Sequence, residues 1–244
     1  MKKWFSVLEL YAAMRMRRVL LVIGAMSVLT VLAYFAFGHP GTTYSLFEIF
    51  SKMRYDRIFM LGYFAMFWAL AAPFTRRDSY YYSLQRLKLS ERSCALILFI
   101  YSALCFVLLI LAQAALLLLM AKMFEIGKPF AGAPQGVLID LTMDQLFFTL
   151  TSFTDRAVAA IRTGYILIAS ACAVHMSVLF AKKKVPVLSF APAVLILLVN
   201  RILWDPLHIL LYVSGALALI CLILAIRMCR GRGPLHDPSD LQEV

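Results

Sequence analysis

Charged side chains are scarce in this chain, and their scarcity limits what the protein is. Only 15% of the 244 residues are Asp, Glu, Lys or Arg, whereas 63% are hydrophobic. A soluble globular protein is about a quarter charged and about half apolar, so this chain has more apolar surface than a water-soluble core of its length can hide. The composition excludes an ordinary soluble domain and indicates that lipid surrounds most of the chain.

Several motifs that carry chemistry are also missing. The one Gly-Lys pair, Gly127-Lys128, is followed by Pro129 and lacks the spacing of a phosphate-binding loop, so we expect no nucleotide site in this chain. The sequence has no H-E-x-x-H zinc helix and no G-x-S-x-G nucleophile elbow. Its five cysteines have no metal-ligand spacing, and no pair of acidic residues falls inside an apolar run. We therefore expect no catalytic residue, no bound cofactor and no metal site.

What the chain has instead is a series of long apolar runs. A helix needs about 20 apolar residues to cross about 30 Å of hydrocarbon, and in lipid the backbone has to satisfy its own hydrogen bonds. Because the runs lack polar alternation, they predict an all-α integral membrane protein with six transmembrane helices. The predicted spans are about 19–37, 58–74, 94–121, 163–181, 185–199 and 207–226.

The positions of Lys and Arg set the predicted orientation. Most of the 24 basic residues lie before the first span, between spans two and three, between spans four and five, and after the sixth. Short loops rich in Lys and Arg stay in the cytoplasm, so both termini are expected inside a multi-pass protein of the cell membrane. The clusters of Lys and Arg at the ends of the spans account for the net charge of +11, so we expect no nucleic-acid partner. Membrane lipid is the partner that the predicted topology implies.

The amino-terminal stretch has the pattern of an amphipathic helix. One helical face carries apolar side chains, namely Trp4, Val7, Leu8 and Tyr11. We predict that residues 1–16 form an interfacial helix in the headgroup plane, with Arg15, which falls on the apolar face, marking its end. The alternative is that this stretch only extends the first span. A six-span domain is expected over residues 17–230 and a disordered cytoplasmic tail over 231–244.

Few polar side chains fall within or beside the predicted spans. His175 lies near the middle of the fourth, Gln113 lies in the third, and Arg201 follows the fifth. A polar group in the membrane is a candidate for lining a pathway, but it also serves helix packing by hydrogen bonding to a neighbouring helix, and Arg201 could snorkel to the headgroups. Both interpretations stay open, and so does an intramembrane enzyme centred on His175.

The most informative segment connects spans two and three. Asp78 or Ser79 would cap a short helix there, with Tyr80, Leu84 and Leu87 on one face. Aromatic and Arg side chains on a compact exposed element are typical of a protein-binding anchor. The alternative is a basic loop that orients the protein and rests on lipid headgroups, and composition alone does not separate the two.

The chain resembles permease subunits of the ABC-2 type, in particular the short six-span permeases of bacterial exporters. The similar features are the amphipathic amino-terminal helix, the Pro-Phe-Thr-Arg-Arg sequence at 73–77, the segment 82–92 leading into a long third span, and Ala-Pro-Gln-Gly at 133–136 in the largest external loop. The short fifth span departs from the family's pattern.

The resemblance implies a short cytoplasmic coupling helix that docks in a cleft of a separate ATP-binding cassette ATPase. The residues that it assigns to this contact are Arg76, Arg77, Tyr80, Tyr81, Leu84, Arg86 and Leu87. It further implies a second permease chain, identical or related, and export as the activity, with ATP hydrolysis on the partner chain and not in this one. A non-transporting scaffold, sensor or immunity protein of the same topology is the alternative.

Overall fold

The computed structural model describes residues 2–37, 49, 52–71, 91–127, 156–181 and 207–228. The regular structure of these residues is all α-helical. It consists of α1 (Lys2–Phe37), α3 (Tyr55–Ala71), α5 (Glu91–Gly127), α8 (Arg156–Ala181) and α10 (Leu207–Met228). The helical class predicted from the apolar runs is therefore confirmed for the described part of the chain.

Five of the six predicted spans coincide with one of these helices. α3 and α10 match spans two and six closely, whereas α5 and α8 begin before the predicted third and fourth spans, because polar residues extend the helices beyond the apolar runs. The predicted fifth span, 185–199, and the tail, 231–244, lie outside the described residues.

Helix α1 differs from the expectation at its start. It continues without a break from Lys2 to Phe37, so Arg15 does not end a separate helix, and the interpretation that residues 1–16 extend the first span describes the backbone better. The predicted apolar face is correct, since Val7 and Tyr11 are buried and Glu9 is exposed. That face is covered by protein contacts, which bury Arg15 along with its apolar neighbours.

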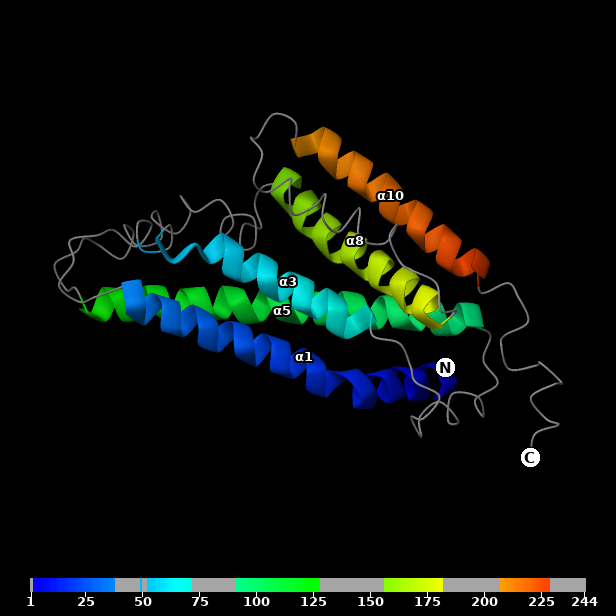
Figure 1. The fold of residues 1–244 in the computed structure, drawn as a ribbon, viewed down its shortest axis with the longest axis horizontal. Helices are drawn as coiled ribbons and strands as arrows, with labels where there is room; N and C mark the ends of the chain where they lie inside the picture. Colours follow the sequence, from blue (N-terminus) through cyan, green and yellow to red (C-terminus); the bar gives the residue numbers. More distant parts are fainter. Residues whose placement is uncertain are drawn as a thin grey trace.

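The helices begin and end at two common ends of the bundle (Figure 1). The starts of α1 and α5 lie toward the right of the view, as do the ends of α3, α8 and α10. Consequently α1 runs parallel to α5 and antiparallel to α3, while α8 and α10, which pack against each other, run in the same direction. The segments 72–90 and 182–206 therefore both leave the described helices at this end.

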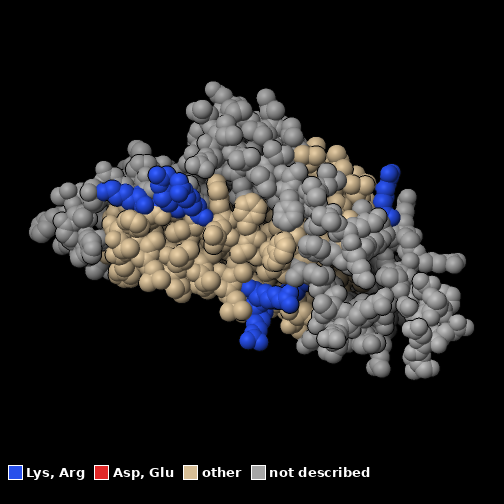
Figure 2. All heavy atoms as spheres, in the orientation of Figure 1, with Lys and Arg blue, Asp and Glu red and all other residues tan. Residues whose placement is uncertain are grey.

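Two of the helices are long and apolar enough to cross a membrane. These stretches are Phe5–Phe37 of α1 and Arg92–Met123 of α5, while α3, α8 and α10 contain shorter apolar stretches. No charged residue occurs between Arg18 and Phe37, or between Arg92 and Lys122. In Figure 2 the basic side chains of the described residues form separate groups, and the rest of the described surface in this view is uncharged. Large apolar side chains cover the outer faces, with Leu21 on α1 63% exposed and Leu119 on α5 58% exposed, as suits contact with lipid.

A continuous apolar core joins α1, α3, α5 and α8. Between α3 and α5 the rings of Tyr63 and Phe106 meet at 5.2 Å between centroids, within the range of aromatic pairs. Between α1 and α3 the contact is so close that a Cβ added at Gly62 would overlap the side chain of Met26. Gly62 thus leaves the space between α3 and α1 that the Met26 side chain fills.

Candidate functional site

The predicted ATPase-contacting residues cannot be placed by the structure. Those outside the described residues are Arg76, Arg77, Tyr80, Tyr81, Leu84, Arg86 and Leu87, together with the candidate pathway residue Arg201. The end of α3 and the start of α5, which flank segment 72–90, are described, and a cluster of polar side chains lies beside them.

This polar cluster is centred on Arg15, the one buried cation among the described residues. We call it the Arg15 cluster and define it as Tyr11 and Arg15 of α1, Tyr101 of α5 and Ser177 of α8. All four side chains are buried, and Arg15 is only 2% exposed. Taking a guanidinium out of water costs several kcal/mol unless its donors are satisfied, so its partners decide whether this position is tolerated.

The guanidinium of Arg15 joins three helices. One terminal nitrogen donates to the backbone carbonyl of Leu70, and the other donates to the Ser177 hydroxyl at 3.3 Å. Leu70 is the next-to-last residue of α3, where carbonyls have no partner within their own helix and the helix dipole is negative. Arg15 therefore caps the end of α3 with a charge of the favourable sign, from a different helix.

Tyr11 extends the cluster to α5. Its ring lies under the Arg15 guanidinium, 5.9 Å from the charge centre, and stacks against Tyr101 at 6.4 Å. Its hydroxyl donates over 3.4 Å to the carbonyl of Cys94, within the first turn of α5. A cation–π contact is worth about 0.5–2 kcal/mol, which offsets part of the loss of hydration of Arg15.

The Arg15 cluster thus holds the two helix ends that flank segment 72–90. Arg15 holds the last turn of α3, from which the segment starts, and Tyr11 holds the first turn of α5, where it finishes. Sequence reasoning missed this role. A signal was available in the spacing of Val7, Tyr11 and Arg15, which places the arginine on the face that α1 buries.

Gln113, a candidate pathway residue, is buried on α5 and pairs with α3. Its side chain is fully buried, and its Oε1 accepts a hydrogen bond of 3.2 Å from the hydroxyl of Tyr55. Its Nε2 has no hydrogen-bond partner within the described part of the chain. This geometry matches the packing interpretation, in which a polar side chain links two neighbouring helices.

His175, the other described candidate, is buried on α8 and faces α10. It is 1% exposed, and its side chain lies close to that of Cys221 on α10, which in turn neighbours Cys172 of α8. Gln113 and His175 therefore interact with different helices, and neither belongs to the Arg15 cluster. Within the described residues no group of His, Cys, Asp or Glu could hold a metal ion.

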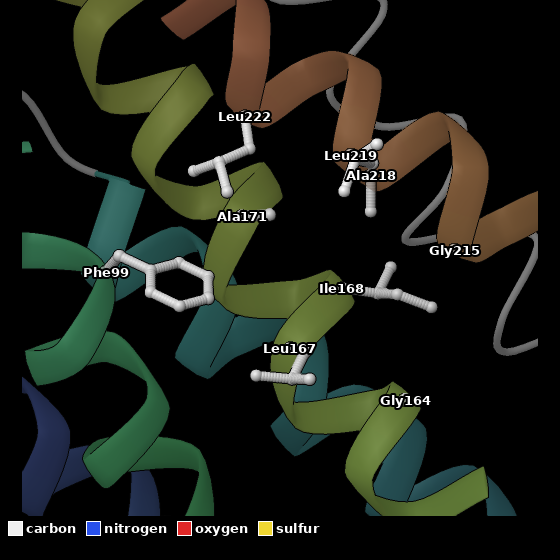
Figure 3. Close-up of a pocket in the computed structure, with 9 residues that line it drawn as sticks. All are labelled: Phe99, Gly164, Leu167, Ile168, Ala171, Gly215, Ala218, Leu219 and Leu222. Carbon is white, nitrogen blue, oxygen red and sulfur yellow. The ribbon is translucent and has the colours of Figure 1, made fainter. Parts of the chain in front are cut away.

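An apolar pocket of about 310 Å³ lies between α5, α8 and α10 (Figure 3). Phe99 of α5, residues of α8 and residues of α10 converge on it. The lining consists of Phe99, Gly164, Leu167, Ile168, Ala171, Gly215, Ala218, Leu219 and Leu222. Because none of these side chains is polar, the described lining of the pocket offers no side-chain group that would orient a charged ligand. Neither His175 nor Gln113 lines it.

Comparison of the chain with protein-family models, with curated proteins and with solved structures finds no significant match.

Proposed function

We propose that this chain is the membrane-spanning permease subunit of an ATP-binding cassette exporter. It spans the membrane six times with both termini in the cytoplasm, and pairs with a second permease to enclose the translocation pathway. A separate ATPase docks on segment 72–90 and drives it, because this chain has no phosphate-binding motif. Closure of the ATPase on ATP would move the segment and switch the pathway between inward and outward access.

The observation that carries the proposal is the common end at which the helices start and finish. The starts of α1 and α5 and the ends of α3, α8 and α10 lie toward one end of the bundle (Figure 1). That end is the one from which the basic, aromatic segment 72–90 leaves and at which the Arg15 cluster holds its flanking helices. An ATPase in the cytoplasm would meet the segment there together with both chain termini.

The parallel course of α8 and α10 supports the fifth span. Since these neighbours run in the same direction, residues 182–206 have to lead from the end of α8 back to the opposite end of the bundle, where α10 starts. A stretch that contains the apolar run 185–199 and connects opposite ends is what a further membrane crossing requires.

Affinity purification of the tagged chain from native membranes in mild detergent tests the proposal. We expect the wild type to retain an ATPase, identified by mass spectrometry and by binding to immobilised ATP. Arg86→Glu and Leu84→Asp should abolish this association while membrane insertion stays normal. Lys183→Glu, the same charge reversal in another predicted cytoplasmic loop, is the matched control and should retain the ATPase.

The possible outcomes distinguish a wrong docking segment from a wrong proposed function. Normal retention of the ATPase by Arg86→Glu and Leu84→Asp would refute the assignment of segment 72–90. The absence of any ATPase from the wild-type preparation would refute the proposed function and favour a scaffold, sensor or immunity protein. Nucleotide-dependent transport in vesicles that hold the purified assembly would exclude that alternative.

A further inference from the structure

We propose that Arg15 is a positioning residue that latches α3 to α1 and α8 and so fixes the point from which segment 72–90 leaves the bundle. The inference rests on the proposed function only in that the segment is taken to receive force from an ATPase. The latch itself follows from the contacts of Arg15, and its first test needs no ATPase.

The geometry requires a side chain that reaches two helices at once. The two terminal nitrogens of Arg15 donate to the Leu70 carbonyl of α3 and to the Ser177 hydroxyl of α8. A guanidinium presents its donors in a fixed planar fork, whereas the compact ammonium of a lysine lacks this shape. The contact to Tyr11 beneath the guanidinium fixes its plane from within α1. Arginine is thus the residue type that suits this position.

The burial of Arg15 shows that its charge alone does not explain why an arginine occupies this position. Arg15 is 2% exposed within a buried face whose other side chains are uncharged, and a side chain such as methionine would fill a similar volume without loss of hydration. Arg17 and Arg18 are exposed on the same helix and supply positive charge near this end of the bundle without that loss. The position of Arg15 is therefore explained by its directional bonds and not by charge alone.

The latch gives segment 72–90 a mechanical route to α8. Leu70 lies in the last turn of α3, so a displacement of the segment acts first on the carbonyl that Arg15 holds. The same guanidinium holds Ser177, and α8 in turn packs against α10 and helps to line the apolar pocket. Movement at the segment would reach α8 through one side chain as a shift of packed helices.

The test measures helix-to-helix distances by electron paramagnetic resonance in the full chain. Spin labels are carried by an unnatural amino acid, which leaves the cysteines in place. One pair of labels, at Leu20 and Trp68, reports α1 against α3, and a second pair, at Trp68 and Leu167, reports α3 against α8. A control pair, at Leu167 and Ile220, reports α8 against α10. All four positions carry exposed side chains.

The variants at Arg15 and Ser177 remove defined contacts of the Arg15 cluster, and Arg17→Met is the control. In Arg15→Met and Arg15→Lys, the distance distributions of both the α1–α3 and the α3–α8 pairs should become broader than in the wild type. Ser177→Ala should broaden only the α3–α8 pair, and Arg17→Met should broaden none. The α8–α10 pair should stay narrow in every variant. Unchanged α3–α8 distances in both Arg15→Met and Ser177→Ala would overturn the proposal, as would equal broadening of all pairs, which indicates general loosening.

A second measurement uses the assembly with its ATPase. Addition of ATP and vanadate should shift the α3–α8 distance in the wild type and in Arg17→Met, and this shift should be lost in Arg15→Met although the ATPase stays bound. An equal shift in Arg15→Met would overturn the role of Arg15 in transmission. A wild-type chain that binds no ATPase would refute the proposed function, whereas the latch is then decided by the distances without ATPase.

Discussion

The hydrogen bond between Tyr55 and Gln113 allows a quantitative test of how polar side chains act inside this bundle. Tyr55 is 1% exposed, Gln113 is fully buried, and the bond between them measures 3.2 Å. Tyr55→Phe keeps the ring in place and removes the hydroxyl that donates to Gln113 Oε1. Since Gln113 Nε2 already has no partner among the described residues, the amide would then be buried without either bond.

The expected loss lies between two reference magnitudes. A buried acceptor left without its donor costs about 1–3 kcal/mol in proteins generally, whereas hydrogen bonds between transmembrane helices average about 0.6 kcal/mol with a maximum near 1.7. We expect Tyr55→Phe to lower the free energy of unfolding by about 1 kcal/mol, or about fivefold in the unfolding equilibrium. Gln113→Leu also takes the acceptor away from the buried Tyr55 hydroxyl, but it removes the amide whose Nε2 has no partner among the described residues, so its net loss should be smaller than that of Tyr55→Phe. The double variant should recover much of the loss.

Reversible unfolding of the purified chain in bicelles would measure these differences as a double-mutant cycle. Tyr34→Phe serves as the matched control, because Tyr34 is buried on α1 and no hydrogen bond of its hydroxyl occurs within the described residues. The reasoning is refuted if Gln113→Leu destabilises the chain as much as Tyr55→Phe does, or if the double variant equals the sum of the singles.

Three further outcomes follow from the packing and the predicted topology. Gly62→Ala should lower the melting temperature in detergent, because the added Cβ would displace the buried Met26 side chain. Gly24→Ala, where an added Cβ meets nothing within 4 Å, should be neutral or slightly stabilising. Equal melting temperatures of the two variants would contradict the tight fit of Met26 against Gly62. A cysteine placed at Gln85 should react with a membrane-impermeant thiol reagent only after the cells are permeabilised. Labelling of this cysteine in intact cells would refute the proposed topology. His175→Ala should lose stability, by about 1 kcal/mol, yet keep nucleotide-dependent activity; lost activity at unchanged stability would favour a pathway role.

Long apolar runs made much of the helical framework predictable. The apolar runs bounded in the sequence by Gly38 and Pro206 predict a helix end at 37 and a helix start at 207, and α1 ends at Phe37 and α10 starts at Leu207. The position of a helix that suits hydrocarbon can therefore be predicted from the local sequence alone.

The Arg15 cluster was not predictable by the same reasoning. A charge on an apolar face normally indicates that the face has ended, so the sequence alone predicts a helix end at Arg15. Its hydrogen-bond partners lie 55 and 162 positions away, and the partner of Gln113 lies 58 positions away. Such contacts depend on which helices become neighbours, and local periodicity does not encode that.

The lengths of α1 and α5 have a consequence for where the protein meets water. Helices of 36 and 37 residues measure about 54 Å, against about 30 Å of hydrocarbon. Even at a steep inclination of about 40° to the bilayer normal, such a helix still covers about 41 Å of depth. A crossing by either helix would therefore leave about 10 Å or more of its length outside the acyl chains. Because α1 and α5 pack against each other and run in the same direction, the parts beyond the hydrocarbon would lie side by side, where a protein in water could bind them.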